Sequence, residues 1–170
     1  MPVNYGIRKG NVFSGFYSMQ TLNKFGETLT LKTYLDTLMQ NIEPLSIKQL
    51  SADDLLIVGN IGYYSKYNHA YNKDAVIVKV KSNGDTVFVK IYKSTIYSTF
   101  TDFVENADGG YTLAGYSKVG LAPGSITQTL LLRTDSVGNE LWRVIYPSSG
   151  YYGGGGGSGA CMLIVCVDKK

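Results

Sequence analysis

The chain has 170 residues, with 16 basic and 13 acidic side chains, a net charge of +3 and lysines scattered along its length. A charge this small and diffuse excludes a typical nucleic-acid-binding surface, and no stretch approaches the roughly 20 apolar residues of a membrane span. The 14 tyrosines and 20 glycines favour many short strands joined by tight turns, so we expect an all-β fold.

The cysteines and the histidine indicate no metal site and no cofactor. Cys161 and Cys166 lie in one apolar run. In a strand, five residues at about 3.3 Å each would separate their Cα atoms by roughly 16 Å, which is beyond the reach of a disulfide. His69 has no close cysteine pair, so zinc binding lacks a motif.

The first expected unit covers about residues 3–44. A short strand at 12–17 is interrupted by a serine and a glycine, and a strand at 28–33 alternates leucine with polar residues. An outermost strand is expected at 38–42. A helix over 34–42 is the local alternative.

The second expected unit covers about residues 47–92 and holds the clearest hairpin of the chain. Ser82-Asn83-Gly84-Asp85 is a type I′ turn signal between an apolar strand and an alternating one. We expect a glycine to end the strand that begins at Leu55, and a polar, tyrosine-rich excursion to follow. The segments of this unit are a turn at 52–54, strands at 55–59, 75–80 and 86–92, and the excursion at 63–71.

The third expected unit covers about residues 94–146. Asp108-Gly109-Gly110 is a turn signal, because glycine readily adopts the positive φ angles of tight hairpins. An apolar strand without alternation follows later, as expected where both faces of a strand are covered. The segments are strands at 100–105, 111–116, 129–134 and 141–146, an excursion at 116–128 and a turn at 135–139.

Corresponding residues recur at a regular distance along these units. Gly15, Gly59 and Gly115 lie 44 and 56 residues apart, and a basic residue recurs at Lys32, Lys79 and Arg133, 47 and 54 residues apart. A period near 50 with insertions confined to polar segments is typical of one four-stranded sheet per unit. The sequence therefore predicts a β-propeller-like array of about three four-stranded blades over residues 1–147.

The remaining residues predict only part of a fourth blade. Residues 148–159 form a flexible segment rich in glycine and serine, and 160–170 hold one isolated strand, with Asp168 in the place of Asp135. This is an incomplete ring, since closed propellers have four to eight blades. We expect either a fragment of a longer propeller or self-association, so that missing blades or other copies cover the sheet edges.

The third unit also carries the fullest form of a known repeat. Its acidic-Gly-Gly-Tyr start, apolar run, Gly-Tyr, Asp-x-x-Gly-Asn turn and tryptophan-bearing strand resemble the blades of exported β-propeller proteins of Bacteroidota, which are associated with type IX secretion. The pattern is also similar to pyrroloquinoline-quinone-type propeller blades. The resemblance implies an extracellular or cell-surface location.

In those propellers, residues of the outer hairpin dock neighbouring blades, and the resemblance implies the same role here. The first unit departs from the pattern, with Thr37 in place of the glycine and no aromatic residue on the strand. The implied docking residues are Asp135, Gly138 and Trp142 in the third unit, and Gly84 and Phe88 in the second.

Such blades serve many functions, so the fold leaves the activity open. We expect a non-catalytic module that is a scaffold or binds glycan or protein through its loops. The alternative is a fragment of a propeller enzyme, a quinone-dependent dehydrogenase or a hydrolase, whose catalytic residues lie outside this chain. Flat rings with polar tips suit sugar and peptide surfaces, although these rings would also pack against a neighbouring blade. The candidate binding residues are Tyr63, Tyr64, Tyr67, Asn68, His69 and Tyr71.

Other polar clusters have simpler explanations than chemistry. The turn 135–140 offers oxygens to calcium, but the matching turn at 83–85 favours a repeated structural element. Asp53, Asp54 and Asp108 fit hairpin turns better than a pair of glycosidase acids. His69 has no partner for a catalytic triad, and the glycine run 153–157 lacks the lysine of a phosphate loop.

Overall fold

The computed structural model describes residues 3–6, 17–22, 25–34, 41–65, 70–94, 96–119 and 126–146. Over these residues the fold is all-β, with strands and turns and no α-helix. The strands are β1 (Val3–Gly6), β2 (Tyr17–Leu22), β3 (Thr28–Tyr34), β4 (Ile42–Gln49), β5 (Leu55–Ser65), β6 (Ala70–Val80), β7 (Thr86–Tyr92), β8 (Tyr97–Glu105), β9 (Tyr111–Val119), β10 (Ile126–Thr134) and β11 (Glu140–Tyr146).

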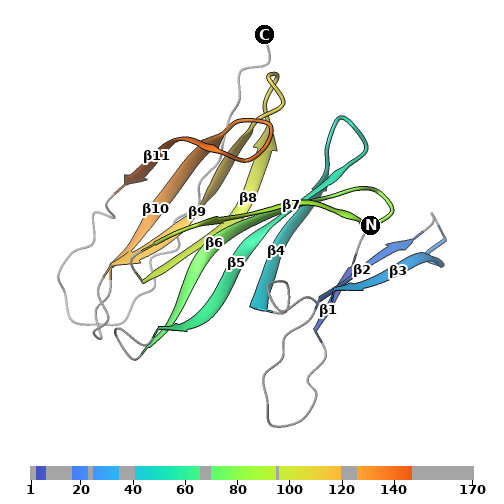
Figure 1. Cartoon of the computed structure of the whole chain (residues 1–170), viewed down its shortest axis with the longest axis horizontal. Helices are drawn as coiled ribbons and strands as arrows, with labels where there is room; N and C mark the ends of the chain where they lie inside the picture. Colours follow the sequence, from blue (N-terminus) through green and yellow to red (C-terminus); the bar gives the residue numbers. More distant parts are fainter. Residues whose placement is uncertain are drawn as a thin grey trace.

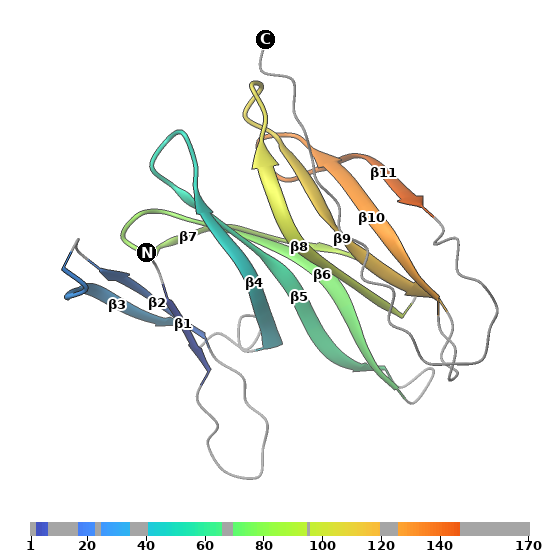
Figure 2. The ribbon, with the colours of Figure 1, turned by 180° about the vertical axis from the view of Figure 1, so that it is seen from behind.

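The strands form three antiparallel groups that follow one another along the chain. Strands β1, β2 and β3 form a separate sheet, the N-terminal group. Strands β4–β7 pair in chain order as the middle group, and β8–β11 do the same as the C-terminal group. A parallel bridge between Lys73 and Tyr97 joins the last two groups. Figures 1 and 2 show the groups side by side, with the middle group between the other two.

Two hydrophobic cores lie between these groups. Strand β6 contributes to both, since neighbouring residues of a strand point to opposite faces. Ile77 packs with Phe100 and Leu132 against the C-terminal group, whereas Val76 packs with Met19 against the N-terminal group. The apolar run of β6 is thus explained by its cover on both faces.

The first boundary between units differs from the sequence prediction. Ile42, expected to end an outermost strand of the first unit, begins β4 and pairs with Ile61 of β5 in the middle group. Its side chain is buried in the core between the N-terminal and middle groups, which fixes it there. The rest of the expected strand, 38–40, lies outside the described residues, as do the middle of the alternative helix, the glycine-rich segment and the isolated C-terminal strand.

Gly59 does not end its strand, contrary to expectation, and Gly115 also lies within a strand. β5 continues to Ser65 and β9 to Val119. Each glycine instead lies opposite a bulge in the preceding strand, between Pro44 and Ser46 in β4 and between Phe100 and Asp102 in β8. A Cβ at residue 59 would lie 2.0 Å from the carbonyl oxygen of residue 43, and one at residue 115 would lie 1.9 Å from that of residue 99. The repeated glycine therefore makes room for a repeated bulge.

The expected type I′ turn at Asn83-Gly84 is also different. Gly84 has φ +85° while Asn83 has no positive φ, and the Gly84 amide donates to the Lys81 carbonyl. This is a three-residue loop in which a glycine forms a bulge after an ordinary turn. The turn before β11 has the same hydrogen bonds, with Gly138 at φ +79°.

Candidate functional site

Three of the six candidate binding residues lie on strands of the β5–β6 hairpin. Tyr63 and Tyr64 belong to the end of β5, and Tyr71 to the start of β6. The described part of the segment expected as a long polar excursion, 63–65 and 70–71, is therefore strand. The other three candidates, in the range 67–69, lie outside the described residues. Rings on paired strands are held in more defined directions than rings on a loop.

Strand alternation separates the two adjacent tyrosines. Tyr64 and Tyr71 are paired across the hairpin, share one face, and are 59% and 62% exposed. Tyr63 points to the opposite face, half-buried, where the Lys93 ammonium lies 5.2 Å from its ring centroid. The structure thus joins Tyr64 to Tyr71 and places Tyr63 apart from them.

The ring of Tyr71 lies over a glycine on the neighbouring strand. A Cβ at Gly62 would come within 2.6 Å of the Tyr71 ring, so the ring occupies the space that a side chain would fill. The backbone of Gly62 thus supports one part of the ring, while most of the ring remains exposed.

Further tyrosines and lysines continue this surface on β6, β8 and β9. Tyr97 stacks on Tyr116 with ring centroids 5.7 Å apart, and their hydroxyls lie 3.4 Å from each other. The ammonium groups of Lys73 and Lys118 lie 5.7 and 5.2 Å from the Tyr97 centroid. Tyr71 is two residues before Lys73 on the same face of β6. We call Tyr64, Tyr71, Lys73, Tyr97, Tyr116 and Lys118 the tyrosine–lysine surface.

One phenol of this surface, that of Tyr97, has a raised pKa. Burial raises the pKa of Tyr97, and its hydrogen bond to Tyr116 raises it further, so the hydroxyl keeps its proton at neutral pH. Lys73 is held by the Glu43 carboxylate at 2.5 Å. The surface therefore offers flat rings, hydroxyl groups and ammonium groups.

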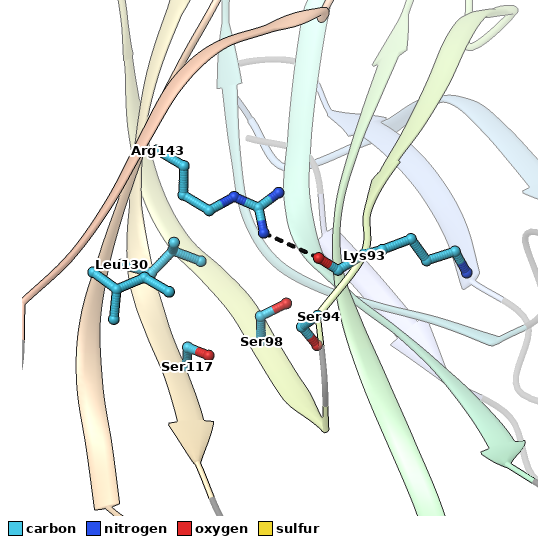
Figure 3. Close-up of a pocket in the computed structure, with 7 residues that line it drawn as sticks. Lys93, Ser94, Ser98, Ser117, Leu130 and Arg143 are labelled. Atoms are coloured by element: carbon cyan, nitrogen blue, oxygen red, sulfur yellow. Dashed lines mark hydrogen bonds between the residues drawn. The ribbon is translucent and has the colours of Figure 1, made fainter. Parts of the chain in front are cut away.

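A small pocket lies between the middle and C-terminal groups (Figure 3). It has a volume of about 330 Å³, and its described lining contains no histidine or carboxylate. Ser98 accepts a hydrogen bond from the Ala75 amide at 2.9 Å, and Ser117 donates to the Tyr97 carbonyl at 3.1 Å. The Arg143 guanidinium donates to the Lys93 carbonyl at 3.0 Å, as the dashed line in Figure 3 shows. Ser98 and Arg143 thus connect the two groups of strands, and the described lining includes no activated nucleophile.

One arrangement joins the N-terminal group to the middle group. The Tyr34 hydroxyl donates to the Gly84 carbonyl at 2.6 Å, and Lys32 forms an ion pair with Asp85. Burial, together with the Asp85 charge, raises the pKa of Tyr34 to about 12. The Lys32 hydrogen bond is the main cause of the lowered pKa of Asp85.

The same arrangement joins the middle group to the C-terminal group. The Tyr92 hydroxyl donates to the Gly138 carbonyl at 2.8 Å, and Lys90 donates to the Asn139 side chain at 3.0 Å. The Phe88 ring lies 3.2 Å from the position of a Cβ at Gly138. We call these two arrangements the tyrosine–glycine contacts. Both glycines and Phe88 are among the docking residues that the resemblance implied, whereas the two tyrosines are not, although each is the last residue of a seven-residue strand.

The other implied docking residues have different surroundings. The Asp135 carboxylate accepts hydrogen bonds from the amides of Val137 and Asn139 and from the Asn139 side chain, which lower its pKa. Asp135 thus closes its own turn. Trp142 lies on β11 and is 45% exposed.

The first unit also has a turn glycine, although the repeat pattern put Thr37 in place of that glycine. Gly26 precedes β3 with φ +82°, as Gly84 precedes β7 and Gly138 precedes β11. Strand β3 is therefore the counterpart of β7 and β11. Consequently Lys32 corresponds to Lys90, rather than to Lys79 as the residue spacing suggested.

Of the three turn aspartates, Asp53 accepts a hydrogen bond from the Gln49 side chain at 3.0 Å, and the other two take part in ion pairs. Asp54 lies 3.3 Å from the ammonium of Lys79, and Asp108 lies 2.5 Å from the guanidinium of Arg133. Among the described residues there is no cluster of three or more histidine, cysteine or carboxylate side chains placed to hold a metal ion. The same part of the chain contains no helix of the length and apolarity of a membrane span.

No protein-family model matches this chain, and no curated protein does either.

Proposed function

We propose that this chain is a non-catalytic, exported β-propeller-like module, a cell-surface scaffold that binds glycan through its tyrosine–lysine surface. The propeller-like part of the proposal is supported by the two consecutive four-stranded groups and by the repeated tyrosine–glycine contacts between groups. The cell-surface location is supported only by the resemblance of the repeats to exported propellers.

The observation that carries the binding function is the exposed cross-strand pair of Tyr64 and Tyr71. Large aromatic side chains that remain more than half exposed on a paired β-hairpin are unusual without a partner. A sugar ring has apolar C–H faces that stack on tyrosine and hydroxyl groups that bind polar tips. Lys118 lies next to the Tyr97 ring and would favour sugars that carry carboxylate or sulfate groups, whereas Lys73 is already paired with Glu43.

The test is a binding panel of neutral glycans, acidic glycans and peptides, measured with the full chain by calorimetry. We expect an acidic glycan to bind, and Tyr64→Ala or Tyr71→Ala to weaken its affinity by about tenfold or more, because an anchoring ring contributes more than about 1 kcal/mol.

Two further variants distinguish an effect of the Tyr64 and Tyr71 rings on binding from an effect on the fold. Tyr63→Ala removes the adjacent ring on the opposite face and should leave the affinity within about twofold of wild type. Gly62→Ala places a methyl group where the movable Tyr71 ring now lies, so it should weaken binding while circular dichroism stays unchanged. Absence of binding across the panel, or equal loss in the Tyr63 and Tyr64 variants, would refute the proposal.

A further inference from the structure

Strands β3, β7 and β11 are three copies of one element in three environments. Each has seven residues and ends in a tyrosine, and each follows a turn glycine with positive φ. The tyrosines that end β3 and β7 each bind the turn glycine of the next group along the chain. A tyrosine–glycine contact therefore has two halves, a strand ending in tyrosine and an incoming glycine turn.

At the C-terminal group, the strand half is exposed. Tyr146 is 51% exposed, whereas its counterparts Tyr34 and Tyr92 are 6% exposed beneath their turns. Trp142 and Val144 share its face and are 45% and 37% exposed. Among the described residues, β11 is thus the counterpart of β3 and β7, but no described turn packs on its terminal tyrosine.

At the N-terminal group, the turn half is exposed. A Cβ placed on Gly26 would have no atom within 4 Å, whereas one on Gly84 would meet Lys32 at 2.8 Å. The apolar side chains Phe25, Leu29 and Leu31 are 77%, 64% and 63% exposed around this turn and along β3. The chain thus carries both halves of a further contact, one at each end of the row of strand groups in Figure 1.

We propose that two copies of this chain associate head to tail, with the Gly26 turn of one copy seated on β11 of the other. The Tyr146 hydroxyl would then donate to the Gly26 carbonyl of the second copy, as Tyr34 donates to Gly84 within one chain. A second copy is the occupant that fits, because Gly26 has the same φ and the same place before a seven-residue strand as the two docked glycines.

This association is heterologous, because the two surfaces in contact are different. Each copy offers one turn and one strand, so the contact either closes a ring or continues into a longer assembly. The exposed apolar side chains at both ends would be removed from water in either case.

Residue 144 gives a selective test of the contact. Val144 occupies the position of Lys32 and Lys90, and Glu27 occupies the position of Asp85, the acidic partner of Lys32. Val144→Lys should therefore tighten the association by about two- to fivefold at low salt, because the lysine would meet the incoming Glu27. Val144→Glu should weaken it by about tenfold, because two carboxylates would meet. Both changes are at a partly exposed position, and circular dichroism verifies that the fold is kept.

The measurement is sedimentation velocity of the full chain over a concentration series at low and high salt. Wild type should associate with increasing concentration, and the gain in Val144→Lys should disappear at high salt. Combining Val144→Glu with Glu27→Lys should restore the association that Val144→Glu alone loses.

Two results would overturn the proposal. One is a wild-type chain that stays monomeric at every concentration, as it would if another part of the same chain covered β11. The other is an equal weakening by lysine and glutamate at residue 144, which would indicate non-specific contact between apolar surfaces.

Discussion

Strands β7 and β11 show how differently one type of strand is used in two places. Both have seven residues, both follow a glycine turn, and both pair antiparallel with the preceding strand of their group. Tyr92 at the end of β7 is buried beneath the Gly138 turn, whereas Tyr146 at the end of β11 is half exposed. The strand is thus formed by pairing within its own group, and its burial depends on the neighbouring group.

The largest expected effect concerns the glycine opposite a β-bulge, which the middle and C-terminal groups share. Gly59→Ala and Gly115→Ala should each lower the free energy of unfolding by about 3 kcal/mol or more, because the new Cβ would overlap a backbone carbonyl at 2.0 or 1.9 Å. Urea denaturation checks both variants. Gly26→Ala is the control, since it adds backbone strain at positive φ without a clash and should cost only about 1 kcal/mol. Similar losses in all three variants would contradict the role assigned to the bulges.

A smaller effect on the free energy of unfolding should distinguish β7 from β11. Tyr92→Phe leaves the Gly138 carbonyl without its hydrogen-bond donor in a buried contact and should cost about 1–3 kcal/mol. Tyr146→Phe makes the equivalent change on β11 and should change stability by less than about 0.5 kcal/mol. Both are measured by urea denaturation at low protein concentration, where self-association is negligible. Equal losses would show that Tyr146 has a partner within the chain.

The smallest expected effect is the pH dependence of the first tyrosine–glycine contact. The pKa of Tyr34 is raised to about 12 by burial and by Asp85, so the folded state keeps a proton that the unfolded state loses near pH 10. Its contribution is therefore complete below pH 10 and is lost as the pH rises from 10 through 12. Between pH 8 and 11, the free energy of unfolding should fall less steeply for Tyr34→Phe than for wild type. The difference should be about 0.5–1 kcal/mol after allowance for solvent screening, and thermal denaturation at each pH measures it. An identical slope for both proteins would show that Tyr34 ionises freely.

The all-β class and most strands could be predicted from the sequence, because alternation and turn residues are local signals. The alternating run that forms β7 and the glycine turn before it are examples. The repeat of Gly59 and Gly115 was also visible, but its cause was not, since it depends on a bulge in a different strand.

The candidate binding surface was predicted only in part. The dense tyrosine segment indicated Tyr64 and Tyr71, but nothing local indicated Tyr97 or Tyr116, which reach the surface through the bridge between β6 and β8 and the register of β9. Similarly, the contact between Tyr34 and Gly84 spans 50 residues, and neither partner indicates the other.

The sequence by itself determined most of the turns and most of the strands among the described residues, because φ preferences and side-chain alternation act over a few residues. Only the tertiary structure decided that Ile42 begins the middle group and does not end the N-terminal one. It also decided which tyrosines are buried under a turn and which face solvent, since these depend on contacts between groups that are distant along the chain.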